Sequence, residues 1–230
     1  AGYSVYVRNT DGSPAVRLGE GSAQDLSPDG EWALAILHSA SDPQLVAYPT
    51  GAGEWKLFSK EALSVYGATF LPDGKQIVFT AREPGRGTRL YLRSFDGGKP
   101  RALTPEGYTG LGIVAPDGKW TVVAGPDRKR YLYPLSGGEP TAVPGLDRED
   151  NVDQRSLDGR FLFVHRRGEI PAKVFRLDIS SGRKELWRAL MPADAAGVPG
   201  ISVSPTPSGE AYLYSYTRTL SDLYLVDGVK

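Results

Sequence analysis

The chain has 230 residues, of which 27 are Lys or Arg and 27 are Asp or Glu, so its formal net charge is zero. Phosphate binding needs a clustered basic excess, and the balanced charge therefore argues against nucleic acid as the main partner. The absence of cysteine excludes disulfides and thiolate metal sites and leaves the cellular compartment open.

The predicted elements begin at the N-terminus with two strands in residues 3–19, YSVYVRNTDGSPAVRLG. They look like the outer two strands of a four-stranded unit whose inner two strands are absent. The chain starts at Ala1, inside strand-like sequence, which indicates a processed chain or a piece of a longer one. No apolar run approaches the roughly 18 residues of a membrane span, and nothing looks like a signal peptide.

A short turn then recurs along the chain. It first occurs in LSPDGEWALAI, Leu26 to Ile36, and FLPDG, VAPDG and RSLDG follow, with a looser copy, TPSGE, near the end. The glycines of these turns are 44, 44, 41 and 50 residues apart. A period in the forties with several strands per unit is typical of propeller blades. The structural turn residues are Asp29, Gly30, Asp73, Gly74, Asp117, Gly118, Asp158, Gly159 and Gly209.

The Asp-Gly pair predicts a two-residue hairpin loop, because such a loop needs positive φ angles that Asp and Gly tolerate. Pro28, Pro72 and Pro116 precede the aspartate and preset the entry into the turn. The turn is therefore expected to close the first hairpin of each blade.

Each turn leads into a strand that is nearly continuous in apolar residues, as expected for a strand covered on both faces. The predicted second strands are 32–38, 76–81, 120–125, 161–166 and 211–217, and the predicted third strands are 45–50, 89–95, 130–136, 173–179 and 222–228. A glycine-containing turn and a fourth strand follow the first four of these third strands. Residues 184–197, KELWRALMPADAAG, are the nearest candidate for a helical turn, which Pro192 and Gly197 would limit.

These elements predict an all-β fold: a β-propeller of four-stranded antiparallel blades, with about five blades and a partial N-terminal blade. Five blades, six blades and a fragment of a larger propeller all stay open. We expect a single domain over 1–230, with units at 1–20, 21–60, 61–104, 105–145, 146–190 and 191–230. The last unit shows three strands. A strand around residues 15–18 could supply its fourth and close a ring, whereas an open edge would invite self-association.

The turns SPDG, LPDG and APDG resemble the WD40-like (PD40) repeats of TolB-type β-propellers. The stretches TDGSPAVRLGEG, GGKPRALTPEG, MPADAAGV and YLYSYTRTLSDLYLVDGVK resemble the C-terminal propeller of certain bacterial serine/threonine protein kinases. This resemblance spans nearly the whole chain and implies a non-catalytic sensing or protein-binding module outside the cytoplasm. Arg155 and Pro205 stand where the family has an apolar residue before the turn, so we expect less regular inner strands in the last two units.

Motifs of catalysis are absent from the sequence. Kinase motifs and the Gly-x-Ser-x-Gly elbow of hydrolases do not occur, and GAGEWK at 51–56 is better explained as a hairpin turn than as a phosphate loop. His38 and His165 are better explained as strand-end histidines bonded to a loop than as a catalytic base or zinc ligands. The acidic stretch Asp147–Asp153 is better explained as a solvated loop leading into an inner strand than as a calcium site. The basic segments 127–130 and 165–168 are better explained as solvated hairpin loops than as contacts for a phosphate or an acidic partner. We expect no metal and no cofactor.

The first strand of each propeller blade lines the axis, so polar residues on these strands form the candidate ligand site. The channel candidates are Gln24, Asp25, Thr69, Asp153, Gln154, Arg155 and Ser202, and the rim candidates are Tyr66, Tyr108, Tyr216 and Arg218. The alternative is a channel whose polar atoms bond ordered water.

A binding module is the function that the sequence favours, with a protein or peptide as partner and a small ligand as a further possibility. In this interpretation the module regulates an attached kinase. The alternatives are a propeller hydrolase that uses the carboxylates of Asp25 and Asp153, and a structural interaction scaffold without a small ligand.

Overall fold

The computed structural model describes residues 2–38, 42–58 and 63–220, in two compact units that are each described by themselves. Unit 1 is Ala1–Val143 and unit 2 is Pro144–Lys230. In the described ranges no helix is long and apolar enough to cross a membrane. The prediction that 1–230 forms a single domain stays a prediction.

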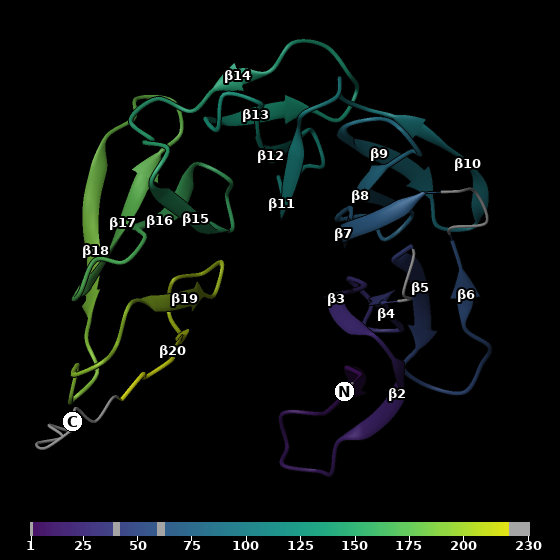
Figure 1. Cartoon of the computed structure of the whole chain (residues 1–230), viewed down its shortest axis with the longest axis horizontal. Helices are drawn as coiled ribbons and strands as arrows, with labels where there is room; N and C mark the ends of the chain where they lie inside the picture. The colour runs from purple at the N-terminus through teal and green to yellow at the C-terminus, as the bar shows by residue number, and fades with distance from the viewer. Residues whose placement is uncertain (1, 39–41, 59–62, 221–230) are drawn as a thin grey trace, which may run out of the picture. The chain divides into compact units, whose positions relative to one another are not determined.

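Every regular element of the described chain is a β-strand (Figure 1). In unit 1 a two-stranded sheet precedes three four-stranded antiparallel sheets. Their strands are β1 (Ser4–Val7) and β2 (Val16–Glu20), then β3 (Ser22–Leu26), β4 (Trp32–Leu37), β5 (Gln44–Pro49) and β6 (Lys56–Leu57), then β7 (Ser64–Phe70), β8 (Gln76–Arg82), β9 (Thr88–Ser94) and β10 (Gly97–Ala102), then β11 (Thr109–Val114), β12 (Trp120–Ala124), β13 (Arg130–Pro134) and β14 (Thr141–Ala142).

Unit 2 contains one four-stranded antiparallel sheet and one two-stranded sheet. Their strands are β15 (Asp150–Arg155), β16 (Phe161–Arg166), β17 (Ala172–Asp178) and β18 (Lys184–Leu190), then β19 (Ile201–Pro205) and β20 (Tyr212–Tyr216). Within each four-stranded sheet the strands lie side by side in chain order. The predicted second strands therefore correspond to β4, β8, β12, β16 and β20, and the first four predicted third strands to β5, β9, β13 and β17. The predicted strand at 222–228 lies outside the described residues.

Apolar side chains from the strands of each sheet and from the residues that flank them form the cores between neighbouring sheets. In unit 1 one cluster joins the first two four-stranded sheets and includes Leu34, Phe70, Ile77 and Phe95, and another contains Val78, Leu90 and Val123 from the next pair of sheets. In unit 2 Phe163 and Val174 pack with residues of β19. Burial on both faces explains why these strands have continuous apolar runs where a half-exposed strand would alternate.

The recurring turn is longer than predicted, and the prediction of a two-residue loop is wrong. Ser27 N donates to Trp32 O and Gly30 N donates to Ser27 O, both at 2.8 Å, so four residues connect the strands. The φ of Gly30 is +75°, and Asp29 is not among the residues with positive φ. Its carboxylate instead accepts a hydrogen bond from Glu31 N at 3.0 Å. Pro28 lacks the N–H with which a residue closing a two-residue loop pairs across the hairpin.

The same backbone bonds close the other four turns. The turn glycine donates to the residue three positions earlier in each case, and its φ lies between +68° and +71°. The aspartates of the next three copies, Asp73, Asp117 and Asp158, accept from the backbone two residues further on, as Asp29 does. In the last copy Ser208 takes this position, and its hydroxyl accepts from Glu210 N at 3.3 Å. The repeat seen in the sequence is therefore one hydrogen-bonded turn used five times.

Two further expectations are overturned in unit 2. Residues 184–190 form strand β18, paired with β17, so this part of 184–197 is not helical, because its hydrogen bonds are used by the sheet. The rest contains only a single turn, in which Val198 N donates to Ala195 O at 3.1 Å. The inner strands of the last two sheets are not less regular. β15 has one register shift, as β3 and β7 have, and β19 pairs with β20 without any. Backbone bonds hold these ladders, so Arg155 and Pro205 do not disturb them.

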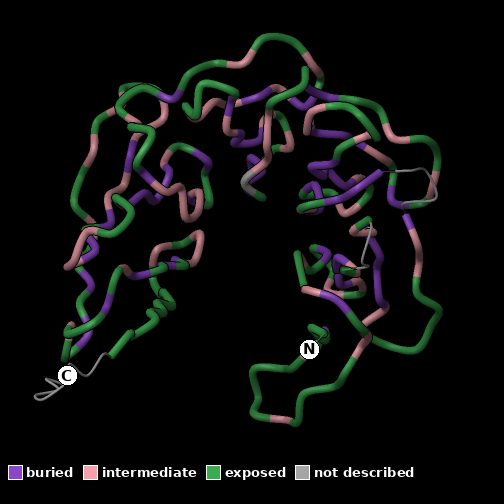
Figure 2. Tube along the Cα trace, viewed as in Figure 1, coloured by how far each residue is buried: buried purple, intermediate pink, exposed green. Residues whose placement is uncertain are grey.

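Strand β20 differs from the other second strands. All five of its residues are exposed, whereas β4, β8, β12 and β16 are buried at most positions (Figure 2). Closure of a ring through residues 15–18, and self-association through an open edge, stay predictions. In the structure β2 pairs with β1.

Candidate functional site

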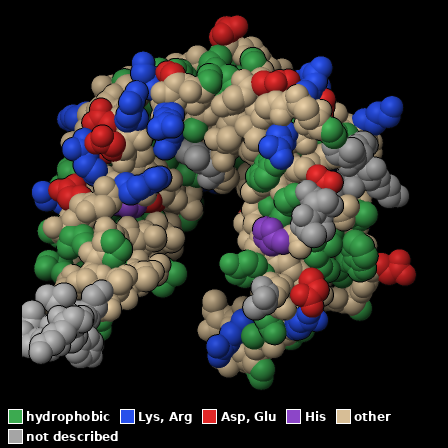
Figure 3. Space-filling view, in the orientation of Figure 1, with side chains coloured by type: hydrophobic (Ala, Val, Ile, Leu, Met, Phe, Trp, Pro, Cys, Tyr) green, Lys and Arg blue, Asp and Glu red, His purple; other side chains and the backbone are tan. Residues whose placement is uncertain are grey.

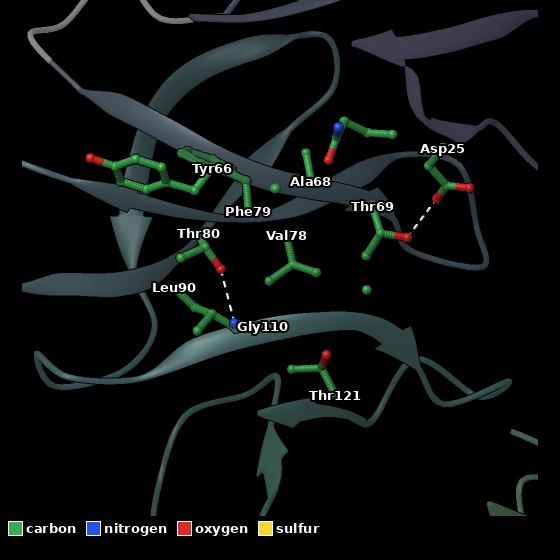
Figure 4. Close-up of a pocket in the computed structure, with 13 residues that line it drawn as sticks. Asp25, Tyr66, Ala68, Thr69, Val78, Phe79, Thr80, Leu90, Gly110 and Thr121 are labelled. Atoms are coloured by element: carbon green, nitrogen blue, oxygen red, sulfur yellow. Dashed lines mark hydrogen bonds between the residues drawn. The ribbon is translucent and has the colours of Figure 1, made fainter. Parts of the chain in front are cut away.

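Three consecutive inner strands of unit 1 form a cleft. Strand β7 contacts both β3 and β11, and side chains of these strands and of β8, β9 and β12 enclose about 360 Å³. The lining residues are Gln24, Asp25, Tyr66, Gly67, Ala68, Thr69, Val78, Phe79, Thr80, Leu90, Gly110, Gly112 and Thr121 (Figure 4). The cleft thus brings together three of the predicted channel residues and one predicted rim residue, all from unit 1. Its size is within the range of small-ligand and peptide pockets.

Asp25 connects two of the inner strands. Its Oδ2 accepts hydrogen bonds from Thr69 Oγ1 at 2.5 Å and from Phe70 N at 2.9 Å, and its Oδ1 accepts from Leu26 N at 2.8 Å. The bond to Thr69 is drawn in Figure 4. The carboxylate therefore holds β3 against β7. It is also the only formally charged group among the described residues that line the cleft.

A second bond connects β8 with the next inner strand. Gly110 N donates to Thr80 Oγ1 at 2.9 Å, as Figure 4 shows. A Cβ atom on Gly110 would lie 3.3 Å from that oxygen and 3.4 Å from Leu90 Cδ2, which is tighter than ordinary side-chain contacts. The close approach of the two sheets at this point therefore favours glycine.

Bulges in the inner strands aim side chains at the cleft. The register of β3 shifts between Ala23 and Asp25, leaving Gln24 unpaired, and the register of β7 shifts between Val65 and Gly67, leaving Tyr66 unpaired. A bulge bends the strand and redirects its side chain, which is why bulges are frequent near binding sites. Tyr66 is 45% exposed, and the guanidinium carbon of Arg82 lies 5.7 Å from its ring centroid.

Tyr108, the other rim candidate of unit 1, does not line this cleft. It is packed against the core cluster that contains Leu90 and Val123. Its ring centroid lies 6.3 Å from that of Tyr131 and 5.7 Å from that of Tyr133. Tyr108 therefore belongs to an aromatic group between two sheets.

In unit 2 the candidate Asp153 is part of a buried pair. His165 Nδ1 lies 2.7 Å from Asp153 Oδ2, and the two side chains are 2% and 7% exposed. The hydrogen bond that His165 donates to the Asp153 carboxylate raises the pKa of His165, and burial raises the pKa of Asp153. The backbone of Ile201 in β19 lies close enough to raise the pKa of His165 as well. The histidine is thus bonded to a carboxylate on the inner strand β15 of its own sheet, where a loop partner was expected.

The other candidates of unit 2 lie on separate parts of the surface or the ladder. Gln154 Oε1 accepts from Arg155 N at 3.0 Å, and burial lowers the pKa of Arg155. Ser202 is exposed on β19 opposite Ser215. Tyr216 stacks on Tyr214 with ring centroids 6.3 Å apart. Arg218 pairs with Asp194 at 3.2 Å.

The contact between His165 and Ile201 repeats the one between Thr80 and Gly110. Thr80 and His165 each lie six residues after the glycine of their turn, and Gly110 and Ile201 each lie eight residues before the glycine of the next turn. In both units a side chain of the second strand thus lies next to the backbone of the following inner strand. This is a recurring contact between neighbouring sheets.

The charged segments of the sequence are paired with nearby groups, and the acidic stretch is not a solvated loop throughout, because Asp150–Asp153 belong to β15 and Asp150 is buried. Arg166 lies 3.4 Å from Asp147 and 3.7 Å from Glu149, and Lys184 lies 2.6 Å from Asp150. Figure 3 shows basic and acidic side chains side by side over this part of the molecule. In segment 127–130, Asp127 accepts from Lys129 N at 3.0 Å inside a hairpin turn. His38 is exposed and lies 2.8 Å from Ser22 Oγ. Within the described ranges, no group of three or more acidic or histidine side chains could hold a metal ion.

Sequence reasoning missed the part of the cleft formed by Gly67, Gly110, Gly112 and Thr80. A signal was present, because glycine inside a strand often marks a bulge or a close approach of backbones. Gly112 has a φ of +71°, and a Cβ there would meet nothing within 4 Å. The segments YGAT and TGLGIV therefore contained usable information about the site.

Comparisons with known proteins support the fold. No family model and no curated protein sequence matches this chain. Among solved structures, TolB from Acinetobacter baumannii is similar with a TM-score of 0.68 and 17% identity over 93% of this chain and 59% of that one. A TolB-type protein from Agrobacterium tumefaciens has a TM-score of 0.71 and 19% identity over 95% and 79%. A prolyl endopeptidase has a TM-score of 0.65 and 14% identity over 93% and 36%.

The chain thus spans about three fifths of the length of the Acinetobacter baumannii TolB. At these identities the likeness is one of fold. The repeated four-stranded antiparallel sheets, the turn that closes each first hairpin and these structural neighbours together identify an all-β chain with the β-propeller fold of TolB-type proteins, made of several blades.

Proposed function

We propose that this chain is a non-catalytic binding module whose inner-strand cleft in unit 1 binds an extended segment of a protein partner. The observation that carries the proposal is the cleft itself, which three inner strands form and which Asp25 and Thr80 fix by hydrogen bonds. A site held by such bonds avoids the cost of ordering on binding.

The lining of the cleft suits a peptide. Strands β3 and β7 stand at the edges of their sheets and pair with one strand each, so main-chain groups on their other edge can pair with an extended chain. Tyr66 offers an aromatic surface at 45% exposure for an apolar or planar side chain. The similarity to the two TolB-type structures supports the fold and gives no information about the ligand of this cleft.

We further propose that the module is the regulatory C-terminal part of a bacterial serine/threonine kinase and that it lies outside the cytoplasm. This proposal is supported only by the resemblance of stretches such as GGKPRALTPEG and MPADAAGV. The reading frame that contains this segment tests it. A kinase domain upstream would support the proposal, and an α/β-hydrolase domain downstream would contradict it.

The hydrolase alternative has less support from the site. Asp25 already accepts three hydrogen bonds from the protein, and Asp153 is bonded to His165. A general acid and a general base need carboxylates that are free to exchange protons with substrate or water. The positions of these two aspartates therefore favour structural roles within their units.

A displayed library of random peptides tests the binding proposal. Peptides enriched on the wild-type protein should lose about tenfold or more in affinity on a Gly67→Val variant. The new side chain would project into the cleft, where a Cβ on Gly67 meets only Gln24 Oε1, at 3.9 Å. Gly51→Val is the matched control, because Gly51 has open space around it and lies outside the cleft. Equal binding to wild type and Gly67→Val would contradict the proposal.

A further inference from the structure

A second cleft of unit 1 lies between β6 and the turn that joins β9 to β10. It has a volume of about 400 Å³, and its walls include Trp55, Lys56, Phe58, Arg93, Phe95 and Asp96. None of its lining residues belongs to the inner-strand cleft. It is therefore a separate concave site, between the first two four-stranded sheets.

The ammonium group of Lys56 is held on aromatic faces. Its Nζ lies 4.5 Å from the ring centroid of Trp32 and 4.1 Å from that of Phe95. The two rings pack edge to face with centroids 5.3 Å apart. Rings attract the cation, but they cannot accept the three directed hydrogen bonds that an ammonium group donates. Within the part of the chain that the structure describes, no carboxylate pairs with Lys56.

The charges around the cleft favour an anion. Arg93 adds a second cation, held by a bond from its Nη1 to Phe58 O and lying 5.4 Å from the Phe58 ring. Asp96 is the one acidic residue among the described residues that line the cleft. Lys56 has no carboxylate partner among the described residues, so its positive charge is available in the cleft, and the apolar walls strengthen its attraction for a negative group.

Apolar surface next to the cations restricts the class of anion. Trp55 is 54% exposed, and the rings of Phe58 and Phe95 line the same cleft. A strongly hydrated inorganic ion would leave this surface in water, whereas a carboxylate on an apolar chain would cover it. The volume suits two or three residues of an extended peptide.

We propose that this cleft binds an acidic peptide segment of a protein partner, with a Glu or Asp carboxylate on Lys56 and an apolar neighbour on Trp55. The next cleft along unit 1 provides a natural comparison. It is lined by Leu71, Lys119 and Leu135, among others, but there Lys119 Nζ lies 3.1 Å from Asp117 Oδ2. Its lysine already has a carboxylate, whereas Lys56 is positioned to accept one from outside.

The test uses two capped peptides, acetyl-Glu-Leu-Glu-Phe-amide and its analogue with Gln in place of both Glu residues. Binding to the whole chain is followed by tryptophan fluorescence, to which Trp55 and Trp32 contribute. We expect saturable binding of the acidic peptide, binding of the Gln analogue that is about tenfold weaker or more, and weaker binding as salt rises from about 50 to 500 mM. Absence of saturable binding by the acidic peptide, or equal binding by the two peptides, would overturn the proposal.

Variants then assign the binding to this cleft. Lys56→Met keeps an unbranched side chain on the two rings but removes the charge, and it should weaken binding of the acidic peptide about tenfold. Lys56→Arg should keep most of the affinity, and Asp96→Asn, at an exposed position, should increase it about twofold. Lys119→Met is the matched control and should have no effect. Wild-type affinity in Lys56→Met would also overturn the proposal.

The two proposals for unit 1 can fail independently. Gly67→Val alters only the inner-strand cleft and should leave the acidic peptide bound with wild-type affinity. If Gly67→Val lost the acidic peptide while Lys56→Met still bound it, the peptide would bind in the inner-strand cleft. This result would contradict the assignment to Lys56.

Discussion

His165 and Asp153 form a buried pair in unit 2, with Nδ1 and Oδ2 2.7 Å apart and both side chains less than a tenth exposed. The hydrogen bond to Asp153 raises the pKa of His165, and the nearby charge of Asp150 acts in the same direction. Burial raises the pKa of Asp153. Both groups therefore hold protons more tightly in the folded unit than in the unfolded chain, so folding is linked to proton uptake.

The first prediction is that the stability of unit 2 falls as pH rises above neutrality. A histidine whose pKa is raised on folding contributes stability that is complete below its unfolded pKa of about 6.5 and is lost as pH rises through the folded value. The raised pKa of Asp153 changes stability in the same direction, because its contribution is lost as pH rises above about 4. The urea concentration at which half of the protein is unfolded should therefore fall as pH rises from about 6 to about 9.

A double variant, Asp153→Asn with His165→Gln, is the control for this linkage. It keeps two hydrogen-bonding side chains at the same positions but removes both titrating groups. Its urea midpoint should vary less with pH over the same interval. A decline as steep as that of the wild type would assign the pH dependence to other groups.

The second prediction concerns removal of His165 alone. His165→Ala leaves the buried Asp153 carboxylate without its partner. Breaking a buried pair in this way costs about 3–5 kcal/mol in the free energy of unfolding. The double variant above should cost clearly less, because no uncompensated charge remains. Chemical denaturation of both variants at one pH measures their free energies of unfolding. A larger loss of stability in the double variant than in His165→Ala would contradict this account.

The third prediction tests the recurring turn. Gly74 has a φ of +68°, and a Cβ there would meet only the ring of Pro28, at 3.6 Å, so a substitution is strained by backbone conformation and not by crowding. Gly74→Val should lower the free energy of unfolding by about 1–2 kcal/mol, and Gly74→Asn by less, since Asn tolerates this conformation. Gly51→Val, at a position with open space and no positive φ, should be nearly neutral. Equal losses at positions 51 and 74 would contradict the argument.

The fold could be predicted from the sequence because one short turn recurs along the chain. Five copies of a turn at intervals near 44 residues locate the first hairpin of each sheet, and apolar runs such as 76–81 locate the buried strands. The predicted two-residue loop is wrong because the residues on either side of the Asp-Gly pair also determine the type of turn. Pro28 has no N–H for a two-residue loop, and the Ser27 hydroxyl donates to Asp29 and accepts from Trp32 N instead. The segment 184–190 has a sequence compatible with helix, but pairing with β17 makes it a strand.

The candidate site could be predicted only in part. Gln24, Asp25 and Thr69 were found because polar residues stand out on inner strands, and these three do line one cleft. The roles of Thr80 and Gly110 depend on a bond between residues 30 positions apart in different sheets, which no local pattern encodes. Tyr108 is an example of the opposite error, because an aromatic residue near a strand end packs between sheets as easily as it lines a rim.

The fourth prediction concerns Asp25, which holds β3 to β7. Asp25→Ala removes the acceptor for Phe70 N and Thr69 Oγ1, both on a strand whose ends are buried. A buried donor left without a partner costs about 1–3 kcal/mol, so the free energy of unfolding should fall by at least this amount. Asp25→Asn keeps one carbonyl acceptor and should cost about half as much. Urea denaturation of both variants and of the wild type measures this order of stabilities. If Asp25→Ala were as stable as the wild type, the carboxylate would not hold the two inner strands together, and a role in catalysis would have to be tested by assaying Asp25→Asn on a panel of hydrolase substrates.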